Sequence, residues 1–228
     1  MARHAPYLLY RKIMYKAVIF DFDGVLFDSV GIKTEAFRTL MIPYGEDVAA
    51  RSVAYHFEYG GISRYRKLRH FHEEYVGETV SEEFINARAE EFATLVMEGV
   101  VDSPWIVGAK ESLDILHRST PLFICSGTPE DELREIVRRK EIGHYFEGVF
   151  GSPTEKPDIL HRICTSLSLT PSEVVFVGDA MTDYNAASKA GVPFVGYGVE
   201  TFGHLNVTVV NDMNELTTCV AQGEITVP

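Results

Sequence analysis

The chain has 228 residues, of which 46% are hydrophobic and 24% charged, and these proportions exclude the disordered and fibrous classes. Its formal net charge of -12 argues against a nucleic-acid-binding protein, which needs a concentrated positive surface, but leaves room for a small anionic ligand bound through a metal and a few cations. No apolar run approaches the roughly 18 residues that a membrane-spanning helix requires. The composition favours a globular protein that acts on a small molecule, with no role for nucleic acid or membrane.

The cysteines and the N-terminal residues bear on the compartment. Cys125, Cys164 and Cys219 are widely separated and lack CxxC spacing, so neither a disulfide framework nor a zinc site is indicated. Residues 1–13 are too short and too mixed in polarity for a secretory signal, and a start at Met14 would leave them as an N-terminal extension. We therefore expect a cytoplasmic protein. The sequence leaves open whether it is a monomer or a dimer.

Short apolar runs alternate with amphipathic segments along most of the chain. The runs predict buried strands of a parallel sheet at residues 17–22, 122–125, 148–150, 174–177, 193–195 and 207–210. Helices are predicted at residues 109–118, 129–140, 158–167 and 183–190. Thr128, followed by Pro129, is expected to open one helix, and residues 170–173 (TPSE) are typical of a capping box. This alternation predicts an α/β fold with an open, doubly wound parallel sheet.

The segment between the first two predicted strands differs from the rest of the chain. Residues 29–102 contain only helical patterns, at residues 32–40, 62–75 and 81–97, and are far longer than one crossover connection needs. We therefore expect residues 14–28 and 103–228 to form the α/β core, with residues 29–102 inserted as a helical cap. Trp105 is expected to pack where the cap returns to the core.

Acidic pairs follow the first and fourth predicted strands. Asp21 and Asp23 are two residues apart on an extended chain, so their side chains point the same way. Asp179 and Asp183 follow the fourth strand. Each pair could be solvated or could cap the next helix. Like charges at the end of an apolar strand are nevertheless costly unless a cation compensates them.

Two further polar groups occur at predicted strand ends. Ser126 and Gly127 follow the second strand just before a predicted helix, where a hydroxyl and free N–H groups can bind an anion. Lys156 precedes another predicted helix. Neither is informative alone, because hydroxyl residues cap many helices and most lysines lie on the surface. In an open α/β sheet, however, ligands bind beyond the carboxyl ends of the strands, so acid pair, hydroxyl, lysine and acid pair predict a single site.

This series of residues resembles the haloacid dehalogenase superfamily, in particular its phosphoglycolate-phosphatase-like members with a helical cap. The matching segments are residues 21–29 (DFDGVLFDS), Ser126, residues 156–157 (KP) and residues 178–183 (GDAMTD). The resemblance covers nearly the whole chain outside the insertion, which in this superfamily is a mobile cap over the active site. It implies a Mg²⁺-dependent phosphatase that hydrolyses a small phosphorylated metabolite. Phosphoglycolate, a sugar phosphate and a nucleotide all remain open as the substrate, and a sugar phosphate or hydroxy-acid phosphate is favoured.

The resemblance also implies roles for the acidic residues. Asp21 would attack phosphorus and form an aspartyl phosphate, and Asp23 would protonate the leaving alcohol and then activate water. Asp21, the backbone carbonyl of Asp23 and Asp179 would hold Mg²⁺, an ion that favours oxygen ligands. Asp183 would be a further ligand or would support the others.

The remaining core residues would neutralise the phosphoryl group. The resemblance implies that Ser126 and Gly127 bind its oxygens and that Lys156 offsets its charge. Four carboxylates and a phosphate dianion carry about six negative charges, whereas Mg²⁺ and Lys156 return about three. One carboxyl is therefore expected to carry a proton, and Asp23 is the candidate because neighbouring like charges raise a pKa.

Substrate specificity is expected to lie in the cap, because the core contacts only the phosphoryl group. In residues 60–70 (GGISRYRKLRH) a glycine pair precedes a cationic helix, from which Arg64 or Lys67 could contact the rest of the substrate. The sequence favours the alternative of a solvated basic face paired with Glu73 and Glu74. Three cap histidines are expected to lie on the surface: His56, His70 and His72.

Other activities of the same superfamily are alternatives. Dehalogenases lack the second acid of the first motif, whereas Asp23 is present. A phosphonate-cleaving enzyme needs a Schiff-base lysine from the cap, for which only Lys33 and Lys67 are available. Sugar phosphomutases often carry a histidine about a dozen residues after the nucleophile, where this chain has Lys33. A non-catalytic phosphate-binding module would usually have lost the nucleophile, the acid or the lysine. The mutase and the binding module remain the main alternatives to a hydrolase.

Overall fold

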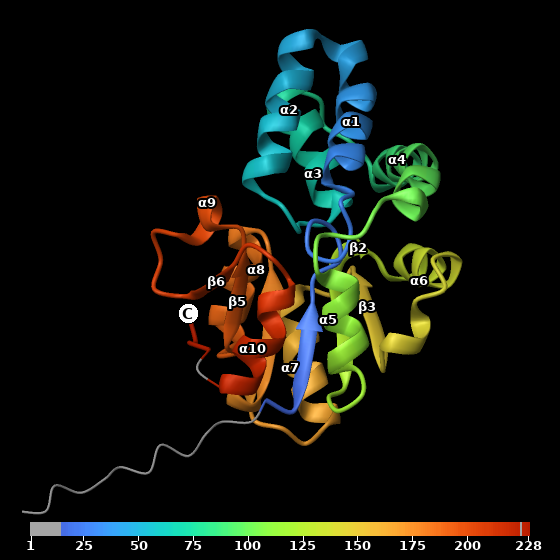
Figure 1. Ribbon diagram of the computed structural model, residues 1–228. Coiled ribbons are helices and arrows are strands. Elements are labelled where there is room, and N and C mark those ends of the chain that lie inside the picture. Colours follow the sequence, from blue (N-terminus) through green and yellow to red (C-terminus); the bar gives the residue numbers. More distant parts are fainter. Residues whose placement is uncertain (1–14, 224) are drawn as a thin grey trace, which may run out of the picture.

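A computed structural model of the protein describes residues 15–223 and 225–228, so the predicted extension, residues 1–13, lies outside the described part. Six parallel strands form one sheet in the order β3-β2-β1-β4-β5-β6 (Figure 1). Their bounds are Ala17–Phe20 (β1), Leu122–Pro129 (β2), Gly148–Ser152 (β3), Val174–Gly178 (β4), Phe194–Tyr197 (β5) and Thr208–Val210 (β6). The chain first moves from β1 towards β3 and then returns to β4 on the other side of β1. Ligands of such sheets bind at this switch point, beyond the carboxyl ends of β1 and β4.

Helices cover both faces of the sheet, which confirms the predicted doubly wound α/β fold (Figure 1). On one face, Val18 and Phe20 pack towards α5 (Ala109–Leu116), α6 (Glu130–Arg139) and α10 (Asn214–Gln222). On the other, Ala17 and Ile19 pack towards α7 (Lys156–Ser166) and α8 (Met181–Ala190). The short helix α9 (Val199–Phe202) follows β5. Because successive strand residues point to opposite faces, the all-apolar sequence of β1 is buried on both.

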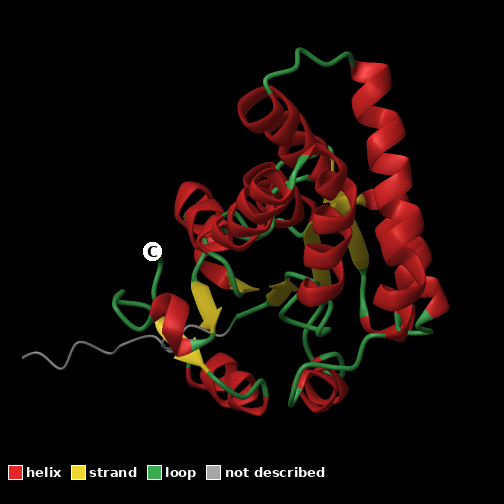
Figure 2. Cartoon of the chain, turned by 90° about the horizontal axis from the view of Figure 1, so that it is seen from above, coloured by secondary structure: helices red, strands yellow, loops and turns green. Residues whose placement is uncertain are grey.

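Four helices are inserted between β1 and β2: α1 (Val30–Met41), α2 (Glu46–Glu58), α3 (Arg64–His70, continued by a π-helical turn over Phe71–Val76) and α4 (Glu82–Asp102). They stand above the carboxyl ends of the strands (Figures 1 and 2). We call these helices the cap. Aromatic rings fill its interior: the centroid of the Phe37 ring lies 4.3 Å from that of Phe92 and 5.5 Å from that of Phe71. The sequence did not predict α2, whose buried residues are only Ala49, Ser52 and His56.

Two chain segments connect the cap to the core, and they lie side by side. Asp28 donates its N–H to the Pro104 carbonyl at 3.0 Å, and Ile106 donates to the Leu26 carbonyl at 2.9 Å. The Phe27 and Trp105 rings pack against each other across this connection, with centroids 4.2 Å apart and planes inclined by 34°. Trp105 therefore packs where the chain re-enters the core, as predicted.

Two predicted helix starts differ in the structure. β2 continues through Thr128 to Pro129, and α6 begins at Glu130, so Thr128 does not open the helix. Thr170 and Glu173 do form the predicted capping box, with the Thr170 N–H donating to the Glu173 carboxylate at 2.9 Å, but around a 3-10 turn that leads into β4. Thr128 therefore lies at the polar end of a strand, where it can contribute to a ligand site instead of capping a helix.

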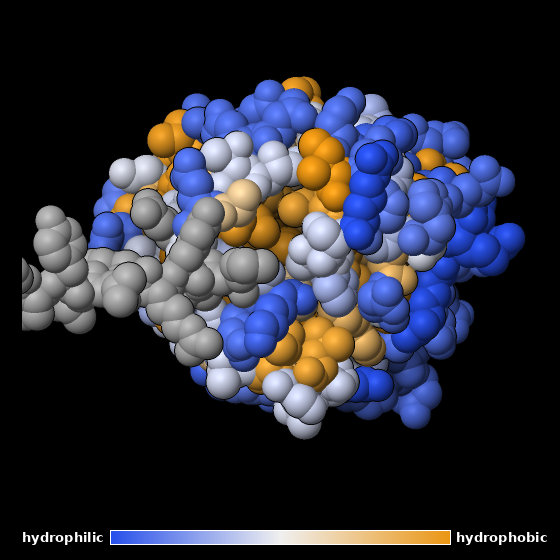
Figure 3. Space-filling view, turned by 60° about the horizontal axis from the view of Figure 1, so that its bottom comes forward, coloured by the Kyte–Doolittle hydropathy of each residue, from blue (hydrophilic) through white to orange (hydrophobic). Residues whose placement is uncertain are grey.

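At the end of the molecule away from the cap, hydrophobic residues occur in small groups among polar ones (Figure 3). In the described ranges, no helix combines the length and the apolar character needed to cross a membrane.

The connection between core and cap generates a stability prediction. Phe27 is 1% exposed and packs on Trp105, so Phe27→Ala should lower the free energy of unfolding by about 3–5 kcal/mol, measured by urea denaturation. Phe57, which is 62% exposed, offers a matched control, and Phe57→Ala should change stability by less than about 0.5 kcal/mol. Equal losses in the two variants would contradict this account of the connection.

Candidate active site

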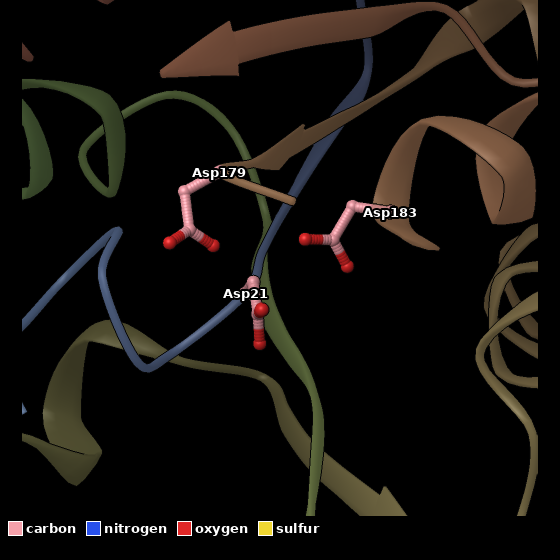
Figure 4. A group of neighbouring side chains, drawn as sticks. All are labelled: Asp21, Asp179 and Asp183. Carbon is pink, nitrogen blue, oxygen red and sulfur yellow. The ribbon is translucent and has the colours of Figure 1, made fainter. Parts of the chain in front are cut away.

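Three carboxylates meet at the switch point of the sheet. Asp21 follows β1, Asp179 follows β4, Asp183 lies in the first turn of α8, and their side chains point towards a common centre (Figure 4). One oxygen from each lies within 4.8 Å of the others. The Asp21 N–H donates to the Val177 carbonyl at 2.9 Å, which fixes the end of β1 against β4. An all-oxygen group of this kind fits a hard divalent cation such as Mg²⁺.

Glycines make room for this group of acids. Gly24 has φ +78°, and a Cβ atom there would lie 2.1 Å from Asp179 Oδ2. A Cβ atom on Gly178 would lie 2.4 Å from the Cβ atom of Asp183. A side chain at either position would displace a carboxylate, so the residue next to each acidic motif is restricted by space.

Lys156 is the cation that joins the acids. Its Nζ atom lies 2.8 Å from Asp21 Oδ2 and 2.5 Å from Asp183 Oδ1, and its side chain is buried. Burial alone would lower the pKa of Lys156, but the charges of Asp183 and Asp21 raise it above its ordinary value. Lys156 therefore stays positively charged within the site. This agrees with its predicted place among the acid pairs and the hydroxyl at the strand ends.

The acids retain excess negative charge despite Lys156. Burial raises the pKa of Asp21 to about 7, with Lys156 opposing the shift and Asp183 and Asp23 adding to it. Burial also raises the pKa of Asp179 well above its usual range, and the charges of Asp21 and Asp183 raise it further. A divalent cation among these oxygens would compensate the repulsion.

Asp23 has a different environment from the other acids. Its carboxylate forms an ion pair with Lys33 of α1 and accepts hydrogen bonds from the hydroxyls of Ser29 at 2.6 Å and Thr128 at 3.2 Å. Burial would raise the pKa of Asp23, but Lys33 and these hydrogen bonds outweigh burial and lower it. The prediction that Asp23 carries the extra proton concerns the site with metal and phosphate bound and stays a prediction; without them, the raised pKa values are those of Asp21 and Asp179.

Sequence reasoning missed both Lys33 and Thr128 as members of the site. Lys33 Nζ also donates to Thr128 Oγ1 at 2.8 Å, so the two residues form one hydrogen-bonded chain with Asp23. The available signal for Lys33 is its position after the first motif, where the sequence suggests only a comparison with a phosphomutase histidine or with a Schiff-base lysine. Thr128 had been interpreted as a helix cap, and only the continuation of β2 brings it to Asp23.

Ser126 and Gly127 lie at the same edge of the sheet, as predicted. Ser126 is buried, and its Oγ atom accepts the Thr128 N–H at 3.2 Å. Because β2 runs on to Pro129 and α6 starts only at Glu130, the two residues lie in the irregular end of β2 rather than at the helix N-terminus that the sequence predicted. A Cβ atom on Gly127 would lie 2.2 Å from the Gly61 carbonyl oxygen of the cap. Core and cap backbones thus approach closely beside Ser126.

The cap is closed over the core in this structure. The Thr182 hydroxyl donates to the Gly60 carbonyl. Gly61 has φ +74°, and a Cβ atom there would lie 3.0 Å from Lys156 Nζ. Arg64 forms a buried ion pair with Glu132 of α6. The glycine pair therefore brings the cap backbone against the charged centre of the core.

A cavity of about 480 Å³ remains between cap and core. The core contributes Asp21, Asp23, Asp179, Ser126 and Thr128 to the lining. The cap contributes Lys33, His56, Arg64, Lys67 and aromatic side chains. The expectation of a solvated basic face is wrong for Arg64 and Lys67, which are buried; it holds for Arg69, which pairs with Glu73 at 3.2 Å. Substrate contact by Arg64 stays a prediction, since its guanidinium is engaged by Glu132.

The cap histidines also depart from expectation. His56 and His72 are buried, and His70 is half-buried and stacked on Tyr55. The His72 ring packs edge-on against Tyr44 and Phe84 inside the cap. The surface prediction is wrong because His56 lies on the buried side of α2 and His72 is directed inward by the π-helical turn after α3.

Lys67 is buried without an acidic partner. It is 2% exposed, its Nζ atom lies 2.7 Å from His56 Nδ1, and it makes no ion pair with any residue in the described ranges. Burial, with the charge of Lys33, lowers the pKa of Lys67 to about 7. Burial and Lys67 lower the pKa of His56 to about 3, so the ring is neutral and accepts from Lys67 at Nδ1.

This environment predicts that Lys67 destabilises the empty protein. Lys67→Met should raise the free energy of unfolding near pH 7 by about 1–4 kcal/mol, because the unfolded chain keeps a proton that burial disfavours. The unfolded state binds more protons between about pH 7 and 10.5, so wild-type stability should gain on the variant as pH rises through that window. Urea denaturation at several pH values measures both effects.

Lys110, exposed on α5 and paired with Asp114, provides the control for this substitution. Lys110→Met should change stability by less than about 0.5 kcal/mol at every pH. A loss of stability in Lys67→Met near pH 7 would contradict the assigned cost of burying this charge.

The chain resembles a family of hydrolases and several known phosphatases. The family model of haloacid dehalogenase-like hydrolases matches residues 15–191. A phosphorylated carbohydrates phosphatase of Thermotoga maritima is 29% identical over 81% of this chain and 85% of its own length. A phosphoglycolate phosphatase of Pseudomonas putida is 26% identical over 86% of this chain and 73% of its own. The solved structure of a β-phosphoglucomutase from Clostridium difficile has a TM-score of 0.74, covers 89% of this chain and 93% of that chain, and at 23% identity shares the fold.

Proposed function

The chain belongs to the haloacid dehalogenase-like hydrolase family, and from this premise we propose that it is a Mg²⁺-dependent phosphatase that uses Asp21 as its nucleophile. Its phosphatase relatives support the coarser statement that it hydrolyses phosphoric monoesters of small molecules. The observation that carries the finer proposal is the convergence of Asp21, Asp179 and Asp183 with Lys156 at one strand edge.

Asp21, the Asp23 backbone carbonyl and Asp179 would hold the metal, with Asp183 as a ligand or as the anchor of Lys156. Bound there, Mg²⁺ would supply positive charge to the phosphoryl oxygens and orient them. Lys156 supplies a further fixed charge, and Ser126 and the Gly127 N–H, which line the cavity, would be donors to the phosphoryl oxygens.

In the first step, an Asp21 carboxylate oxygen attacks phosphorus and the ester P–O bond breaks. The leaving oxygen takes a proton from the Asp23 carboxyl, and Asp21 becomes an aspartyl phosphate. In the second step, Asp23 takes a proton from the water that attacks this intermediate. Inorganic phosphate leaves, the Asp21 carboxylate is restored and Asp23 is again protonated.

Lys33 sets the protonation of Asp23 between these steps. The ion pair holds Asp23 as the carboxylate, which is the form that the second step needs. A phosphate dianion entering beside Asp23 opposes Lys33 and favours the protonated form that the first step needs. Because Lys33 belongs to α1, this control depends on the cap being closed, and we propose that residues 29–102 move as a cap relative to a core of residues 14–28 and 103–228.

The substrate proposal is a small phosphorylated metabolite, either a sugar phosphate or a hydroxy-acid phosphate, and the compartment proposal is the cytoplasm. A sugar phosphomutase remains the second candidate, since a β-phosphoglucomutase shares the fold. Activity that requires a sugar bisphosphate activator would favour the mutase, and phosphate binding without turnover would favour a non-catalytic module.

The nucleophile assignment is tested with p-nitrophenyl phosphate. The wild-type protein should release phosphate only with Mg²⁺, and Asp21→Asn should lower kcat at least about 10³-fold because the amide is not nucleophilic. Asp131→Asn, at an exposed position of α6, is the matched control and should keep wild-type kcat. Turnover by Asp21→Asn close to that of Asp131→Asn would refute the assignment.

The proposed role of Lys33 predicts a change in pH dependence. Lys33→Met removes the charge that lowers the pKa of Asp23, so the pH profile of kcat should move to higher pH. Lys33→Arg, which keeps the charge, should restore most of the wild-type profile. A profile that loses amplitude without moving would mean that Lys33 supports only the structure of the site.

A further inference from the structure

Helix α6 of the core lies beneath the cap and contacts it at two places along its length (Figure 1). In the first turn of α6, Glu132 forms an ion pair with Arg64 of α3. Further along, the Arg139 guanidinium donates to both carboxylate oxygens of Glu98 in α4, at 2.9 and 2.6 Å. Because seven residues make about two helical turns, Glu132 and Arg139 lie on the same side of α6. That side of the helix therefore faces the cap.

The C-terminal end of α6 is tied to the connection between core and cap. Lys140, which follows α6, donates from Nζ to the Ser103 carbonyl at 2.8 Å and lies 3.7 Å from the centroid of the Phe27 ring. Ser103 belongs to the returning segment of the connection and Phe27 to the outgoing one. Glu132 lies about 12 Å further along the helix from Lys140. A cap that turns about the connection would therefore move more at Glu132 than at Lys140.

The two ion pairs of α6 differ in burial. The side chains of Arg64 and Glu132 are 5% and 9% exposed, whereas those of Arg139 and Glu98 are 28% and 75% exposed. An exposed pair contributes little, because water and salt screen it. A buried charge without its partner is strongly unfavourable, whereas in an open molecule water would solvate both charges. The closed position therefore depends on Arg64 and Glu132 being present together.

We propose that Glu132 is a positioning residue that latches the cap, because its carboxylate receives the Arg64 guanidinium when the cap closes over Asp21. The inference rests on the proposed phosphatase with its moving cap, and it assigns the closed position to one pair of charges. Arg64 then acts through the position of the cap and not as a ligand of the substrate. Loss of the pair lowers the fraction of closed molecules, and kcat/KM falls with that fraction.

A double-mutant cycle distinguishes a latch from a substrate contact. Glu132→Leu and Arg64→Met each leave one buried charge alone, and each should lower kcat/KM for p-nitrophenyl phosphate at least about 10-fold, the scale of a hydrogen bond to a charged group. The double variant has neither charge and should recover to within about 3-fold of the wild type, since apolar side chains can replace a buried ion pair. A double variant as impaired as Arg64→Met would place Arg64 on the substrate and overturn the latch. Wild-type kcat/KM in either single variant would also overturn it.

Two control variants assign the effect to Glu132. Glu135 lies in the same helix and pairs with Arg138, outside the cap, so Glu135→Leu should keep the wild-type kcat/KM. Glu98→Gln removes the exposed pair and should change kcat/KM by less than about 3-fold. Circular dichroism checks that each variant is folded, and Glu132→Gln, which keeps the shape of the side chain, takes the place of Glu132→Leu if the latter is unfolded. Equal losses in the Glu132 and Glu135 variants would overturn the assignment.

A scattering measurement separates this inference from the proposed hydrolase. If the wild-type protein releases no phosphate from p-nitrophenyl phosphate, the hydrolase proposal fails, but the latch can still be tested without substrate. Small-angle X-ray scattering should give a larger radius of gyration for Glu132→Leu than for the wild type, because more molecules are open. The double variant with Arg64→Met should return to the wild-type radius. Equal radii for the wild type and Glu132→Leu would overturn the latch.

Discussion

Mutual repulsion among buried carboxylates is the constraint on which the rest of this structure depends. Asp21, Asp179 and Asp183 arrive from two neighbouring strand ends, and their oxygens lie within 4.8 Å of one another. Lys156 compensates part of that charge, and the raised pKa of Asp21 shows that the compensation is incomplete. The same imbalance, which is unfavourable for folding, is one that a bound divalent cation would relieve.

The cap continues this pattern of incomplete pairing. Its two buried lysines have opposite situations: Lys33 is neutralised by an acid of the core, whereas Lys67 has a neutral partner. The first contact joins the cap to an acid of the core. The second leaves a buried charge with no acidic partner among the described residues.

Much of the architecture could be predicted from the sequence, because buried parallel strands appear as short apolar runs and acids at their ends are conspicuous. The six strands, the helical insertion and the gathering of Asp21, Ser126, Lys156 and Asp179 follow from that pattern. Helix α2 escaped prediction because its buried side is narrow and partly polar. Local hydrophobic periodicity therefore reveals the buried strands, but it does not reveal a helix whose apolar side is this narrow.

The protonation of Asp23 and the burial of the cap cations could not be predicted in the same way. Both depend on pairs far apart in sequence, such as Lys33 with Thr128 and Arg64 with Glu132, which form only when cap and core meet. The sequence of the cationic helix looks the same whether a given residue faces water or a cavity. Which of the two a residue faces can be decided only when the surface packed against the helix is known.

The connection between the two parts has a consequence for how such a protein can change over evolution. The outgoing and returning segments are hydrogen-bonded neighbours, through Asp28 with Pro104 and Ile106 with Leu26. The core therefore presents an insertion point with adjacent ends. An insertion of another length or fold could be accommodated there without stretching the sheet, so the machinery that cleaves the ester and the surface that selects the molecule can diverge as independent modules.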